Sequence, residues 1–197
     1  IIGFQNTTVG NAFSAVIGVA LIAAYRLLGA SWLIMKTDGA LQQKAVQWAK
    51  RSLLLTAVGV VAISLGTPWA SERIFEKWFS FPNVVMLFPI PVMTVVLFYV
   101  IHRSLSRLPL RLSEGNQYGV AVPFMATLGI FLLSSYGLGY SLFPWLVIDQ
   151  LNFWQAASSV EALTVIFYGV VVVFPIIIAY TAFSYRVFWG KSTPLKY

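Results

Sequence analysis

The stretch "LLGASWLIMKTDG", residues 27–39, ends a long apolar run and then places a lysine, a threonine, an aspartate and a glycine in succession. A helix needs about 20 apolar residues to cross the hydrocarbon core of a bilayer, and this run extends back to about Ala12. Trp32 is typical of headgroup depth, and Lys36 of the end of a membrane span. The stretch therefore predicts the end of a transmembrane helix and a turn in which Asp38 caps the next helix.

The whole chain has the composition of an integral membrane protein. Of its 197 residues 59% are hydrophobic and 10% are charged, and the mean hydropathy is +0.81. A soluble domain carries about 25% charged residues, so these polar groups could not cover a water-facing surface. The absence of cysteine excludes disulfides and thiolate metal sites. The chain begins with Ile1 and shows no signal peptide, so we expect it to be part of a longer protein.

Five stretches are long and apolar enough to span a membrane. They run over about Ala12–Met35, Ser52–Trp69, Val84–Ile101, Tyr118–Phe143 and Val160–Phe188. The connections between them are too short to fold alone. The sequence therefore predicts an all-α integral membrane protein in which residues 1–197 form a single membrane domain.

Basic residues are sorted onto alternate connections between these spans. Ten follow the first, third and fifth spans: Lys36, Lys44, Lys50, Arg51, Arg103, Arg107, Arg111, Arg186, Lys191 and Lys196. The intervening connections hold only Arg73 and Lys77. Because cytoplasmic loops carry an excess of lysine and arginine, the C-terminus is expected in the cytoplasm and the start of the chain outside.

Two connections have amphipathic patterns of their own. In "ALQQKAVQWAKR", residues 40–51, four apolar residues recur at helical spacing, which favours a short basic helix lying on the inner membrane face: Leu41, Ala45, Trp48 and Ala49. In "SERIFEKWFSFPN", residues 71–83, four apolar residues share one helical face: Ile74, Phe75, Trp78 and Phe79. Four charged residues share the other: Glu72, Arg73, Glu76 and Lys77. Aromatic residues at such positions are most simply interfacial anchors.

No constellation of catalytic or metal-ligating residues is evident. The single histidine, His102, falls at the cytoplasmic end of the third span, where a surface position is favoured over haem ligation. The methionines have no ligand spacing, and the acids Asp149 and Glu161 belong to an outer loop. We therefore predict no catalytic, cofactor-binding or metal-binding residue in this chain.

Arg26 is the one ionisable residue deep within a predicted span, ten residues before Lys36. An arginine at mid-helix costs about 2.5–3.5 kcal/mol on the insertion scale, which the surrounding apolar residues offset. One hypothesis is that Arg26 pairs with an acidic group on another subunit or on missing sequence. The alternative is that it reaches toward the headgroups or is merely tolerated.

Several ordered motifs resemble subunit II of the cytochrome bd-type quinol oxidases, including the cyanide-insensitive branch. The first, "LLGASWLIMKTDGALQ" at residues 27–42, is similar to the signature of the family's fifth helix. The others are "QWAKR" (47–51), "KWFSFPN" (77–83), "YGLGYSLFPWLV" (136–147), "FWQAASSVEAL" (153–163) and "FPIIIAYTAFSYRVFWGK" (174–191).

The resemblance implies nine helices in two four-helix bundles plus one peripheral helix, with an outer N-terminus. This chain would then hold the last five helices, a four-helix bundle and one further helix, with the upstream helices missing. Its orientation would match the charge pattern. The acidic proton-path positions proposed for subunit II lie in the missing half.

The resemblance further implies a multi-pass subunit of the bacterial cytoplasmic membrane in a complex that oxidises quinol and reduces dioxygen to water, generating a proton gradient. Subunit I would carry haem b and haem d, while this part acts as a non-catalytic scaffold. A small accessory subunit and a structural quinone or lipid are compatible with this reading; nucleic acid is not expected as a partner.

Two other readings are open. Kinks at Pro175, Pro89 and Pro91, together with Arg26, are compatible with a membrane transporter or permease subunit. A passive assembly factor would look much like a scaffold. A transporter would be favoured by inverted internal repeats, and no convincing similarity among the five spans is seen.

Overall fold

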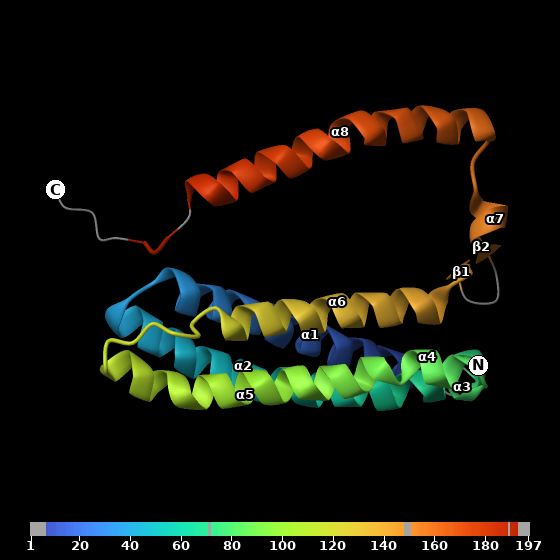
Figure 1. The fold of residues 1–197 in the computed structure, drawn as a ribbon. Helices are drawn as coiled ribbons and strands as arrows, with labels where there is room; N and C mark the ends of the chain where they lie inside the picture. The colour runs from blue at the N-terminus through green and yellow to red at the C-terminus, as the bar shows by residue number, and fades with distance from the viewer. Residues whose placement is uncertain (1–6, 71, 148–150, 189, 193–197) are drawn as a thin grey trace. The chain divides into compact units, whose positions relative to one another are not determined.

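The structure is a computed structural model that describes residues 7–70, 72–147, 151–188 and 190–192 (Figure 1). The described residues form two compact units. The first extends to Ser141 and includes Ser192, and the second runs from Leu142 to Lys191. The sequence also supports predictions for Asp149 and Lys196, but these two residues lie outside the described ones.

Four long helices build the first unit and lie side by side in Figure 1: α1 (Thr7–Lys36), α2 (Gly39–Ala70), α5 (Pro89–Ser113) and α6 (Val122–Leu142). Two short helices, α3 (Glu72–Phe79) and α4 (Asn83–Leu87), connect α2 to α5. Together with α8 of the second unit, the described residues contain five helices long and apolar enough to cross a membrane. The predicted all-α membrane fold, a four-helix bundle and one further helix, is confirmed.

The core of the first unit lies between its four long helices. On α1 the buried residues recur every three or four positions, which places them on one helical face: Ala20, Ala23, Leu27, Ala30 and Ile34. Leu27, Ala30 and Ile34 pack in one cluster with residues of the other helices, among them Ala49, Leu53, Ile101, Leu105 and Ile130. Burial of this face stabilises the bundle, while the outward face of α1 is largely apolar, with Arg26 as an exception.

Small residues let α1 and α2 approach each other closely. A Cβ added at Gly59 would overlap the Cβ of Ala20, and one added at Gly66 would overlap the ring of Phe13. Ser31 and Ser52 are fully buried, and their hydroxyls have no hydrogen-bond partner in the described part of the chain. Their small side chains allow α1 and α2 to lie close together, since membrane helices associate through close packing.

The prediction that residues 40–51 form a separate short helix on the inner membrane face is wrong. These residues begin α2, which continues unbroken from Gly39 to Ala70. Ala45 and Ala49 are buried in the bundle core, but Leu41 and Trp48 are exposed, and the polar Gln42 is buried. The apolar residues of this pattern are explained in part by the core cluster, which contains Ala45 and Ala49.

The third span contains the boundary between α4 and α5 at its prolines. Helix α4 ends at Leu87 and α5 starts at Pro89. Phe88 between them keeps helical φ and ψ angles, and its N–H donates to the carbonyl oxygen of Val84 at 2.9 Å. The chain therefore stays helical across this boundary, and Pro89 lies in the first turn of α5, where its missing N–H is well tolerated. The kink expected at Pro89 and Pro91 stays a prediction.

The second unit begins with an aromatic hairpin and ends in a long helix. Strands β1 (Trp145–Val147) and β2 (Leu151–Asn152) pair antiparallel and lead into α7 (Phe153–Ala156), which starts with an Asn152–Gln155 capping box. Helix α8 (Val160–Val187) remains helical at Pro175, and none of its residues is buried. Ser159 caps its first turn by accepting from the N–H of Ala162.

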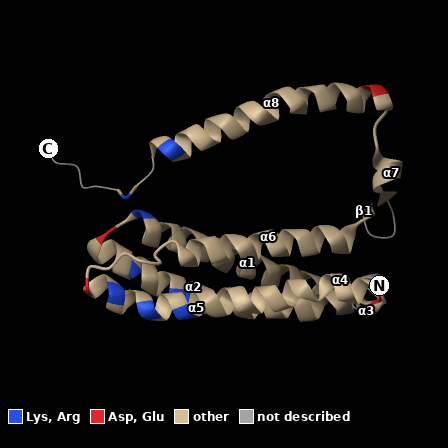
Figure 2. Cartoon of the chain, in the orientation of Figure 1, with Lys and Arg blue, Asp and Glu red and all other residues tan. Residues whose placement is uncertain are grey.

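Apart from Arg26 in α1, charged residues of the first unit lie toward the helix ends. Figure 2 shows lysine and arginine gathered at the end where α1 finishes and α2 begins. The same end carries the last turns of α5, with Arg107 and Arg111. The long apolar middle of the bundle is left for the hydrocarbon core.

Candidate functional site

Arg26 lies in the middle of α1, and its side chain is exposed. Among the described residues it forms no hydrogen bond or ion pair. Its neighbour Tyr25 instead contacts α6, where its ring centre lies 5.5 Å from that of Phe131. The predicted intramembrane charge is therefore on the outside of the bundle rather than in its core.

A polar network ties α1 to the following elements at the basic end of the first unit. The buried Gln42 donates from Nε2 to the carbonyl oxygen of Ile34 at 2.8 Å and to Oε1 of Gln117 at 3.1 Å. Gln117 in turn donates to Oδ1 of Asp38 at 3.2 Å. These bonds satisfy a free carbonyl at the end of α1 and join it to the α5–α6 connection. Capping of α2 by Asp38 stays a prediction.

Lys36 is the last residue of α1, at this same basic end, as its position after the apolar run predicts. Its Nζ lies 5.1 Å from the centre of the Trp32 ring, and Trp32 packs on Phe124 of α6 at 5.0 Å. The carbonyl oxygen of Lys36 accepts from the N–H of Ser192 at 2.7 Å. Ser192, which belongs to the first unit, therefore lies at the end where α1 finishes.

A second polar cluster holds α3 against the opposite end of α6. Lys77 donates from Nζ to the carbonyl oxygen of Tyr140 at 2.6 Å and lies 4.7 Å from the centre of its ring. Trp78 Nε1 donates to Oγ of Ser141 at 2.9 Å, and the Tyr140 hydroxyl donates to Oδ1 of Asn83 at 2.8 Å. Partial burial lowers the pKa of the Lys77 ammonium below its usual value of 10.5.

The apolar face predicted for the 71–83 segment is carried by helix α3, although its residues differ in their burial. Ile74 is buried and Trp78 is half-buried, but Phe75 and Phe79 are exposed and contact each other with ring centres 4.8 Å apart. Lys77, expected on the charged face, is half-buried against α6. Nothing in the sequence signalled this contact, because it depends on where α6 ends.

The described histidine and methionine side chains do not gather in the bundle core. His102 is exposed near the basic end of α5, away from the bundle core. Met86, Met93 and Met125 are also exposed, and Met35 is half-buried. Within the described part of the chain, no three histidine, aspartate or glutamate residues gather where they could hold a metal ion. The second predicted loop acid, Glu161, lies exposed in the first turn of α8.

The chain was compared with known proteins. The model of the family described as cytochrome bd terminal oxidase subunit II matches residues 2–188. A search of curated proteins finds no match. The family match extends over all five spanning helices and through every quoted motif but the last residues of the sixth. The chain therefore belongs to the cytochrome bd terminal oxidase subunit II family, whose members are membrane subunits of a haem-dependent oxidase and assemble with a subunit I.

Proposed function

We propose that this chain is a non-catalytic scaffold in a bacterial quinol:dioxygen oxidoreductase that generates a proton gradient. The observation that carries the proposal is the family match over residues 2–188. In this proposal subunit I holds haem b, haem d and the quinol-oxidising loop. The described residues of the present chain brace it from within the cytoplasmic membrane.

The interior of the first unit supports the scaffold role. Its core is a closed cluster of alanine, leucine, isoleucine and valine side chains, centred on residues such as Leu27, Val46 and Leu105. A close-packed apolar core excludes water and stiffens the surface that it supports. Such a body suits a subunit whose work is to hold a partner in place and keep lipid and water from its haems.

The expected orientation follows from the basic residues. Ten lie on three alternate connections and two on the others, which favours a cytoplasmic C-terminus. The hydrogen bond from Ser192 to Lys36 is compatible with this arrangement, because both residues then lie at the same end of the first unit.

The proposal is tested on the complex purified through a tag on this chain. We expect the reduced-minus-oxidised absorption spectrum to show haem b and haem d bands, and we expect quinol-driven oxygen uptake. Both should be retained after His102→Ala, because the exposed histidine is not a ligand in this proposal. A haem-free preparation that moves a solute across vesicles would contradict the proposal and favour a transporter. Loss of a haem band in His102→Ala would contradict the non-catalytic role.

A further inference from the structure

Arg26 lies deep within the first spanning segment. The first spanning segment runs from Gly10 to Lys36, so Arg26 is ten residues from one end and sixteen from the other. At 1.5 Å per residue these separations are about 15 Å and about 24 Å. A helical side chain leans toward the N-terminus of its helix, which for Arg26 is the more distant end. Reaching the nearer headgroups would oppose that lean.

The surface around Arg26 is not covered by the rest of the first unit. Val19, Ile22, Arg26 and Gly29 are exposed and follow one another at spacings of three or four residues; we call them the Arg26 face. The side chain of Ile22 is 70% exposed, and a Cβ added at Gly29 would meet nothing within 4 Å. The buried residues of α1, such as Ala23 and Leu27, occupy other positions around the helix.

The described residues offer no counter-charge at this depth. Five of the six carboxylates are described: Asp38, Glu72, Glu76, Glu114 and Glu161. None of these five lies more than two residues inside a spanning helix; Glu161 is the second residue of α8. The sixth, Asp149, falls in the sequence between the last two predicted spans. An acidic partner for Arg26 is therefore expected outside residues 1–197.

The positive charge of Arg26 indicates what kind of partner would cover the Arg26 face. A charged arginine in contact with lipid tails is costly, and such residues usually face protein and pair with an opposite charge. A carboxylate can accept two parallel hydrogen bonds from a guanidinium, which is the strongest pairing available to it. Gly29, one turn from Arg26, leaves space for a second helix to approach closely.

We infer that the Arg26 face docks a transmembrane helix of the same oxidase complex, outside residues 1–197, that carries an aspartate or glutamate at the depth of Arg26. The inference rests on the proposed function only in taking the partner from that complex. The pair would fix the depth and rotation of α1 against its neighbour. It adds a specific contact to the otherwise apolar outer surface of the bundle.

Photocrosslinking in the intact complex tests the occupant. A photoreactive amino acid replaces Ile22 or Gly29 on the Arg26 face, or Leu21, which is exposed but on a different side of α1. Mass spectrometry then maps the adducts. We expect Ile22 and Gly29 to reach one transmembrane peptide that contains an aspartate or glutamate, with Leu21 giving a different product. Adducts only with lipid, or with a peptide lacking a membrane carboxylate, would overturn the inference.

Charge exchange provides the second test. We expect Arg26→Glu to lower the amount of complex recovered through the tag at least about tenfold, and Arg26→Lys to lower it less. Arg107→Leu, at an exposed arginine near the basic end of α5, should leave recovery within about twofold. Changing the mapped acid to arginine should restore recovery of Arg26→Glu. Undiminished recovery of Arg26→Glu, or failure of the exchange to restore it, would overturn the pairing. Haem spectra of the unaltered complex report separately on the proposed function.

Discussion

At the scale of single residues, long polar side chains supply donors to carbonyls at the ends of the membrane helices. Gln42 donates to Ile34 at one end of the first unit, and Lys77 donates to Tyr140 at the other. The last carbonyls of a helix have no intrahelical donor, and an unpaired one is costly where water is scarce. Each of these contacts therefore stabilises a helix end and the neighbour that supplies the donor.

The first prediction concerns Gln42→Leu, which keeps an apolar side chain of similar size but removes the donor. The carbonyl of Ile34 and the amide of Gln117 each lose a partner, so we expect a loss of about 1–3 kcal/mol in stability. Thermal unfolding of the purified complex in detergent measures the effect. Gln43→Leu is the matched control, because Gln43 is exposed on the same helical turn. Equal midpoints for the two variants would contradict the prediction.

The second prediction follows from the lowered pKa of Lys77. The unfolded chain holds the Lys77 proton up to about pH 10.5, whereas the folded chain releases it at lower pH because burial disfavours the ammonium. The unfolded state thus binds more protons in the window just below pH 10.5, and stability rises with pH there.

The variant Lys77→Met isolates this group. We expect the unfolding midpoint of the wild-type complex to rise relative to Lys77→Met as the pH is taken from 8 toward 10. The control is Lys50→Met, since Lys50 is exposed on α2. A wild-type midpoint that falls relative to Lys77→Met over this range would show that the charged form is the favoured one.

At the scale of elements, the five spans could be predicted because each is a long apolar run bounded by charge or turn residues. The sequence could not predict that residues 40–51 continue into α2. Its polar spacing fits a surface helix equally well, and the outcome depends on the core that receives Ala45 and Ala49. The contact of Lys77 with α6 was missed for a related reason, since it joins residues 63 positions apart in the chain.

The third prediction tests the close contact of α1 with α2. Gly59→Ala places a Cβ against the Cβ of Ala20, backbone-attached atoms that cannot rotate away. The helices must separate, and overpacking of this kind typically costs about 1–3 kcal/mol. The control is Gly169→Ala in α8, where the added Cβ meets nothing within 4 Å.

Thermal unfolding in detergent again measures both variants. We expect Gly59→Ala to lower the midpoint and Gly169→Ala to leave it unchanged or raise it, because alanine favours the helix over glycine. A larger loss for Gly169→Ala would mean that α8, rather than the α1–α2 contact, limits the stability of the complex.

At the scale of the whole molecule, the candidate site was only half predictable. Arg26 could be found from the sequence, because a charge inside an apolar run stands out and carries a known cost. The side of α1 on which Arg26 lies could be known only from the structure, in which Ala23 and Leu27 are buried and Ile22 and Gly29 are exposed. Its partner could come from neither source, since the five carboxylates that the structure describes lie at or beyond the ends of the spanning helices, and Asp149 falls in the sequence between the last two predicted spans.

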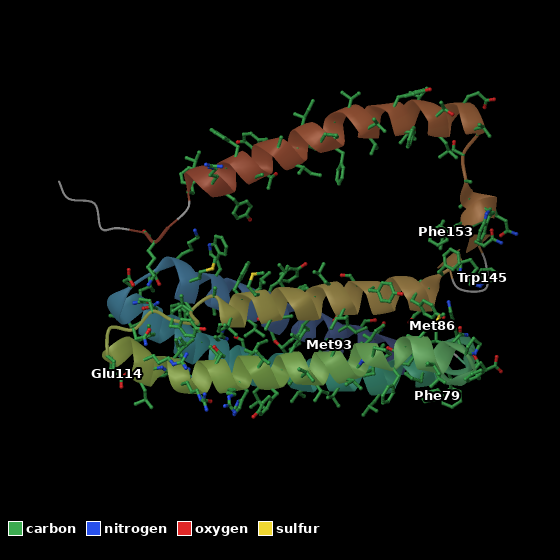
Figure 3. The ribbon with its side chains drawn as sticks, viewed as in Figure 1. Phe79, Met86, Met93, Glu114, Trp145 and Phe153 are labelled. Carbon is green, nitrogen blue, oxygen red and sulfur yellow. The ribbon has the colours of Figure 1, made fainter. Side chains whose placement is uncertain are left out.

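The fourth prediction concerns the orientation of the chain in the membrane. Figure 3 shows Glu114 at the end of α5, at the opposite end of the first unit from Phe79 in α3. Glu76 lies in α3 beside Phe79, and both glutamates are exposed. Because residues 1–197 contain no cysteine, Glu76→Cys and Glu114→Cys each introduce one labelling site into this part of the protein, at a matched residue.

A membrane-impermeant maleimide applied to spheroplasts should label Glu76→Cys and leave Glu114→Cys unlabelled, with the reverse pattern in inverted vesicles. The expected result follows from the basic residues near Glu114, because an excess of lysine and arginine favours the cytoplasmic side of a membrane. Ser192→Cys should behave like Glu114→Cys, since Ser192 bonds to Lys36 at the end of α1. Labelling of Ser192→Cys from outside would place an even number of crossings between Glu76 and the tail, and the charge-based orientation would then have to be abandoned.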